Sequence, residues 1–84
     1  MKEKIKTQLR AYLDLKLRLC KQYMQEHDLA AKAVWQQAIG AVEYTSVSAY
    51  SLYPNAGLSA EIDVIWEMDY KKAFEKTLFS EVGE

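Results

Sequence analysis

Apolar and polar residues alternate at helical spacing along the first third of the chain. One face, projected at about 100° per residue, holds apolar and aromatic side chains, namely Ile5, Leu9, Tyr12, Leu13, Leu17, Cys20, Tyr23 and Met24. The opposite face is polar, and leucine, lysine, arginine and glutamine are good helix formers. The pattern predicts an amphipathic helix over residues 3–26.

The same spacing continues through residues 28–52, with a second edge made of the small residues Ala30, Ala33 and Ala41. Small residues on one side and large ones on the other suit a middle helix between two neighbours, and Asp28 is a plausible N-cap. Because no Gly or Pro separates the first two segments, one continuous helix over residues 5–52 is an alternative. It would be about 70 Å long and would need a partner chain to cover it.

The stretch IDVIWEMDY, residues 62–70, fits a strand in steps of two and a helix in steps of three and four. A β-hairpin pairing residues 42–53 with 58–70 across the turn PNAG is therefore conceivable. Three observations favour a helix over residues 59–80: Ile65 fits only the helical stripe, that stripe continues to Leu78, and Ser59 stands at an N-cap position. The sequence predicts a single all-α domain over residues 1–84, an antiparallel three-helix bundle, with the α+β hairpin fold as the alternative.

Charge is unevenly distributed in these 84 residues, although the net charge is only −1. Residues 1–21 hold seven basic and two acidic residues, whereas residues 61–84 hold three basic and seven acidic ones. The two ends are complementary, so we expect them to neutralise each other within the fold or across a dimer. Lys16 and Asp69 both lie in apolar stripes, which predicts a buried ion pair between them.

Several kinds of chemistry find no support in the sequence. Cys20 is the only cysteine and His27 the only histidine, and neither belongs to a metal-binding motif. The glycines are isolated, so there is no phosphate-binding loop. We therefore expect a non-enzymatic protein with no catalytic residue, cofactor or metal. No stretch approaches the roughly 20 apolar residues that span a bilayer, and no signal-peptide core is visible, so we expect a cytoplasmic protein without membrane contact.

Aromatic residues are too numerous for the core of so short a chain. Tyrosine is favoured where an apolar surface meets water, as at protein interfaces. The candidate interface consists of Tyr44, Tyr50, Tyr53, Trp35 and Trp66. We expect these residues to contact a protein partner, most simply in a homodimer, because a dimer extends a small core.

A rival hypothesis is a small nucleic-acid-binding regulator. It would use the basic residues of the first helix, which are Lys2, Lys4, Lys6, Arg10 and Arg18. The acidic residues in 61–84 argue against this hypothesis, because they can pair with the same basic residues within the fold.

The stretches AVWQQAIGAVEYTS and IWEMDYKKAFEKTLF carry a family resemblance. Gly40, Ala41 and Val42, followed by Trp66, Phe74 and Leu78, resemble a pattern in small uncharacterised proteins of phages and integrated elements of Gram-positive bacteria. The resemblance covers roughly the last fifty residues. It implies a helical fold and a mobile-element origin, and it supplies no activity.

Overall fold

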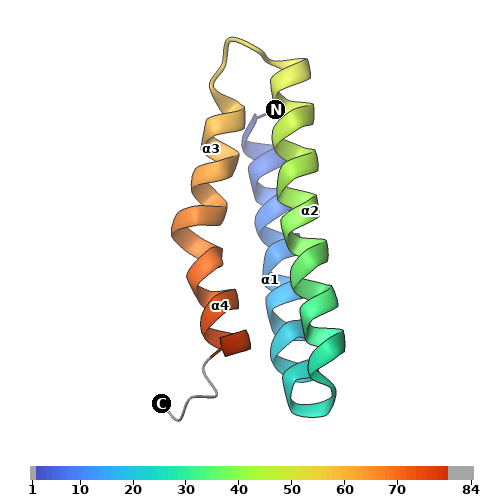
Figure 1. Cartoon of the computed structure of the whole chain (residues 1–84). Coiled ribbons are helices and arrows are strands. Elements are labelled where there is room, and N and C mark those ends of the chain that lie inside the picture. Colours follow the sequence, from blue (N-terminus) through green and yellow to red (C-terminus); the bar gives the residue numbers. More distant parts are fainter. Residues whose placement is uncertain (1, 80–84) are drawn as a thin grey trace.

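The computed structural model describes residues 2–79, nearly all of them helical (Figure 1). Helix α1 spans Lys2–Glu26 and helix α2 spans Asp28–Leu52. A third segment follows, made of α3 (Leu58–Ile65), the π-helical turn η1 (Trp66–Tyr70) and α4 (Lys71–Phe79). The all-α prediction is confirmed, and the predicted end of the third helix at residue 80 lies outside the described residues. Residues 2–79 contain no strand, so the β-hairpin alternative is not supported.

A single residue connects α1 to α2. His27 has φ −165° and ψ 101°, an extended conformation, and its carbonyl accepts hydrogen bonds from the N–H groups of Ala30 and Ala31. His27 is therefore the N-cap in place of Asp28. Beyond this break the helices lie side by side, and their contacts pair Cys20 with Ala31 and Lys16 with Gln37. The continuous helix over residues 5–52 is wrong, because the chain reverses direction at His27.

The turn between α2 and α3 contains Pro54 and ends at Gly57, whose φ of +69° is in the left-handed region that favours glycine. The Glu61 N–H donates to the Gly57 carbonyl at 3.1 Å, so Gly57 and not Ser59 precedes the helix. The Ser59 hydroxyl instead lies 2.6 Å from the Ser46 hydroxyl. This contact joins the start of α3 to α2.

IDVIWEMDY is helical, and its second half forms the π turn. The Lys71 N–H donates to the Trp66 carbonyl five residues earlier. Apart from Ile65, the buried residues of this segment recur every four positions, at Leu58, Ile62, Trp66, Tyr70, Phe74 and Leu78. In an unbroken α-helix each step of four drifts by about 40°, so this stripe would rotate by about 200° from first to last. The extra residue of the π turn removes about 100° of that drift, which keeps the stripe against α1 and α2.

The core is built from small residues on α2 and large ones on the third segment. The buried residues of α2 are Ala31, Val34, Ala38, Val42, Ser46 and Ala49. Phe74, Leu58 and Ile62 are completely buried on the third segment, and Leu13 and Cys20 on α1. Figure 1 shows α2 at one side of the molecule, with α1 and the third segment beside it. One face of α2 is thus left without a neighbour.

Candidate functional site

The outward face of α2 carries large apolar side chains exposed to solvent. The exposed fraction is 76% for Tyr44, 67% for Val47, 62% for Tyr50 and 66% for Leu29. These residues share a face about 120° wide with smaller exposed residues at helical spacing. We call this surface the α2 face; it consists of Leu29, Ala33, Gln36, Gly40, Tyr44, Val47 and Tyr50. Contiguous apolar surface of this kind marks interaction sites in soluble proteins.

The α2 face carries very little charge. Between residues 29 and 53 the only charged side chains are Lys32 and Glu43, both exposed and both on the same edge of the face. Among residues 2–79 neither of them takes part in an ion pair. A solvent-facing helix normally carries polar residues over its outer half. The α2 face departs from that pattern at its two ends, at Leu29 and over Tyr44, Val47 and Tyr50.

Gly40 stands exposed near the middle of the α2 face. A Cβ atom added there would meet nothing within 4 Å, and its backbone φ is not positive. Glycine in a helix interior costs roughly 0.5–1 kcal/mol relative to alanine. The packing among residues 2–79 gives no steric reason for this glycine. A small residue on an outer face allows another backbone to approach closely.

The five predicted interface residues are divided between surface and core. Tyr44 and Tyr50 lie on the α2 face, whereas Tyr53 caps the end of α2 and packs half-buried against the core. Trp35 is half-buried and meets Phe79 edge-on, with ring centroids 5.7 Å apart. Trp66 is only 8% exposed and packs against Phe74. Its assignment to an interface is wrong, because α3 places it in the core stripe one turn after Ile62.

Sequence reasoning missed Leu29, Val47 and Gly40 as members of this surface. The interface prediction considered aromatic residues only and left out aliphatic ones. The pattern that could have identified the face is the near absence of charge between residues 29 and 53.

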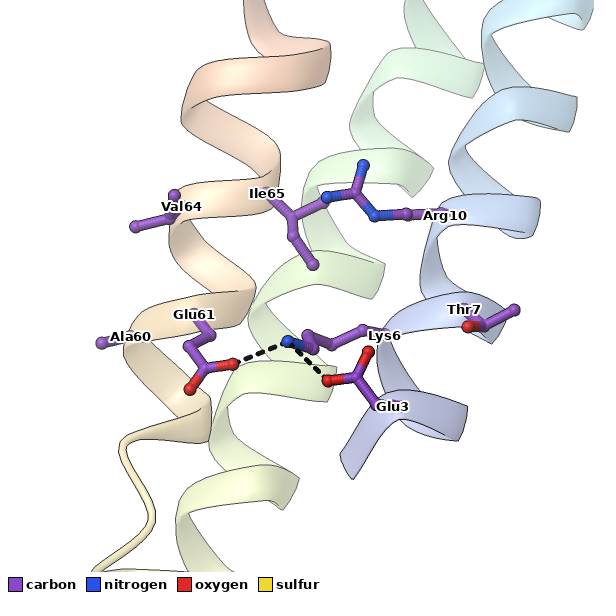
Figure 2. A pocket seen from close by; sticks show the side chains of 8 residues that line it. All are labelled: Glu3, Lys6, Thr7, Arg10, Ala60, Glu61, Val64 and Ile65. Carbon is purple, nitrogen blue, oxygen red and sulfur yellow. Dashed lines mark hydrogen bonds and ion pairs between the residues drawn. The ribbon is translucent and has the colours of Figure 1, made fainter. Parts of the chain in front are cut away.

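A second surface feature is a groove of about 420 Å³ between α1 and α3. Figure 2 shows Lys6 reaching between two carboxylates, with Nζ 2.8 Å from Glu61 Oε1 and 3.2 Å from Glu3 Oε2. Arg10, above it, forms an ion pair of 2.8 Å with Asp69. The groove is therefore lined by charges that already have partners.

These contacts shift the pKa values of Lys6, Glu61 and Arg10. The hydrogen bond to Glu61 raises the pKa of Lys6, and the same bond lowers the pKa of Glu61. The hydrogen bond to Asp69 raises the pKa of Arg10. Each charge is held in its ionised form by the opposite end of the chain.

The five candidate nucleic-acid contacts do not form one patch. Lys6 and Arg10 are paired with the acidic third segment, and Lys2 lies one turn before Lys6 on the same side of α1. Lys4 and Arg18 are exposed elsewhere on α1. Lys4 and Arg18 are separated by about 21 Å along the helix axis.

The predicted buried pair of Lys16 and Asp69 does not form. Lys16 donates to Gln37 Oε1 at 2.8 Å and lies over the Tyr12 ring, while Asp69 binds Arg10. The Asp69 side chain is 45% exposed. The π turn explains the correction, because it places Tyr70 in the core stripe and turns Asp69 towards α1.

Two buried groups could be mistaken for reactive ones. The Tyr70 hydroxyl donates to Asp14 Oδ1 at 2.7 Å, and burial, followed by this bond, raises the pKa of Tyr70 to about 12. Burial also raises the pKa of the Cys20 thiol, which lies 3.7 Å from the Ala31 carbonyl. A thiol kept protonated and covered is a poor nucleophile.

Residues 2–79 contain no cluster of three or more His, Cys, Asp or Glu side chains able to hold a metal ion. Over the same range, no helix is both long enough and apolar enough to cross a bilayer. The chain matches no protein-family model, no curated protein and no solved structure.

Proposed function

We propose that this chain is a non-enzymatic interaction and assembly protein that self-associates through the α2 face. The observation that carries the proposal is a 25-residue helix that exposes four large apolar side chains on its outer face. Leu29, Tyr44, Val47 and Tyr50 are each more than half exposed, while the buried side of the same helix is mostly alanine and valine. Covering this face would remove apolar surface from water at about 25 cal/mol per Å².

The scaffold for this role is an antiparallel three-helix bundle acting in the cytoplasm. In that arrangement α1 and the third segment occupy the inner side of α2 and leave its outer side for the partner. The resemblance to small proteins of phages and integrated elements gives the proposed origin.

Nucleic-acid binding through α1 has weaker support. Two of the five cations that it would use, Lys6 and Arg10, are paired at 2.8 Å with Glu61 and Asp69. Freeing them for phosphates would break contacts between α1 and the third segment.

A pair of matched substitutions tests the proposal by sedimentation velocity. Val47→Asp places a charge on the α2 face, and Val64→Asp places one at an exposed valine of α3. Both sites are more than half exposed, so both variants should retain the helical circular dichroism of the wild type. We expect Val47→Asp to be monomeric at concentrations where the wild type and Val64→Asp associate. The proposal fails if Val47→Asp associates as the wild type does.

A further inference from the structure

We propose that the α2 face binds a second copy of this chain, with the two α2 helices antiparallel and crossing near Gly40. This inference rests on the proposed function, and it adds the identity of the partner and the register. Its first support is charge complementarity. Lys32 and Glu43, the charged side chains of residues 29–52, have opposite signs and lie on the same edge of the α2 face, with Asp28 one turn before Lys32.

That edge position selects an antiparallel pair. When a twofold axis relates two facing antiparallel helices, the same edge of each helix meets, and the residue order is reversed. Lys32 of one copy then faces Glu43 of the other, and the contact occurs twice. Within one chain the two residues are about 16 Å apart along the helix axis, too far for an ion pair. In a twofold parallel pair the two Lys32 side chains would lie at the same height on opposite edges of the interface, and neither would meet Glu43 of the other copy.

The same register pairs the other residues of the face by size, and only Tyr50 has no α2 residue opposite it. Leu29 faces Val47, Gln36 faces Gly40, and Ala33 faces Tyr44. These pairs and the Lys32–Glu43 pair are all centred within about one residue of Ala38. One alignment therefore gives an apolar contact, two large-to-small contacts and an ion pair.

Gly40 is the second, independent support. Its missing side chain serves nothing in the packing of residues 2–79, since an added Cβ would meet no atom within 4 Å. In the proposed dimer Gly40 lies close to the crossing point, where the absence of a side chain lets the two backbones approach.

Charge reversal tests the register. We expect Lys32→Glu and Glu43→Lys each to weaken self-association on the order of tenfold at low ionic strength, measured by sedimentation equilibrium. The double variant Lys32→Glu/Glu43→Lys recreates both pairs with reversed signs. It should restore the wild-type dissociation constant to within about threefold. Lys72→Glu, at an exposed lysine of α4, is the matched control and should leave association unchanged.

The outcomes separate this inference from the proposed function. If Val47→Asp dissociates the protein but the double variant stays as weak as the single ones, the α2 face associates and the antiparallel register is wrong. If the single variants associate as the wild type does, the register is also wrong. Restoration by the double variant supports it.

Gly40→Leu tests the helix crossing, because an open face and a close crossing predict opposite changes in the strength of self-association. Added apolar surface on an open face would tighten association, whereas a side chain at a close helix crossing separates the helices. We expect association to weaken more than tenfold, with helical circular dichroism unchanged because the site is open in the monomer. Tighter association would overturn the crossing near Gly40.

Discussion

Helix α2 and the third segment distribute their side chains in opposite ways. The third segment buries large residues, such as Phe74 and Ile62, and presents charges to solvent; residues 58–79 hold eight charged side chains. Helix α2 buries small residues, such as Ala31 and Ala38, and exposes large ones, such as Tyr44. The outer side of the third segment is therefore mostly charged, although three apolar side chains are exposed on it, namely Val64, Met68 and Phe79. The outer side of α2 instead leaves apolar surface that favours a partner.

The largest expected effect comes from deleting a buried ring of the third segment, compared with deleting an exposed ring of α2. Phe74→Ala should destabilise the fold by roughly 3–5 kcal/mol, because it deletes a completely buried ring. Tyr50→Ala removes a ring that is 62% exposed and should change the monomer by no more than about 0.5 kcal/mol. Urea unfolding at concentrations where the protein is monomeric measures both. Equal losses for the two variants would contradict the contrast between the segments.

Much of this architecture is predictable from the sequence. The boundary near residues 26–28 and the end of the second helix at residue 52 agree with the structure, because broad amphipathic stripes and Pro54 define them locally. The π turn was not predicted. It arises from a tertiary requirement, since a stripe spaced every four residues stays on one side of a helix only with an inserted residue.

The wrong placement of Asp69, and with it the wrong Lys16–Asp69 pair, follows from the unpredicted π turn. An unbroken α-helix puts Asp69 in the apolar stripe, and that led to the pairing with Lys16. Only part of the α2 face was predicted from the sequence, for a different reason. The sequence reveals a small edge and a large edge on residues 28–52, but the rotation of the helix within the fold decides which edge is covered.

A second test concerns the partly buried Tyr70 hydroxyl, which links the third segment to Asp14 and to the Arg10 carbonyl of α1. Tyr70→Phe removes the hydrogen bond to Asp14 and should cost about 1–2 kcal/mol at neutral pH. Because folding raises the pKa of Tyr70 to about 12 from an ordinary value near 10, its contribution is present below pH 10. It is lost as the pH rises from about 10 towards 12.

Unfolding at alkaline pH, monitored by circular dichroism, checks this loss of the Tyr70 contribution. The wild type should lose its advantage over Tyr70→Phe across that range, and the control Tyr44→Phe, at an exposed ring, should behave as the wild type does. A constant difference between wild type and Tyr70→Phe from pH 8 to pH 12 would show that the hydroxyl makes no such bond.

A smaller effect tests the outer face of α2. Gly40→Ala should stabilise the monomer by about 0.5–1 kcal/mol, because alanine favours the helix and the added Cβ meets nothing. Gly57→Ala is the control with the opposite sign, since φ is +69° at that position. Thermal unfolding of dilute protein measures both. A loss of stability in Gly40→Ala would mean that this glycine has a role within the fold.

The smallest effect belongs to the charges of the third segment, which already have partners. Glu61→Gln removes the carboxylate bound by Lys6, an exposed pair, so the change in stability at neutral pH should be slight. The direction in which this stabilisation changes with pH is nevertheless defined. Because the Lys6 hydrogen bond lowers the pKa of Glu61, the stabilisation is present above the ordinary glutamate pKa and is lost as the pH falls through the lowered one.

Acid unfolding at low salt should therefore bring the wild type and Glu61→Gln together below about pH 4. Glu75→Gln, which removes a carboxylate outside any ion pair among residues 2–79, should run parallel to the wild type. Glu61→Gln should also self-associate as the wild type does, because its charge is balanced inside the fold, whereas Glu43→Lys on the α2 face should not. If Glu61→Gln weakened association as much as Glu43→Lys, both segments would face the partner and the contrast between them would be wrong.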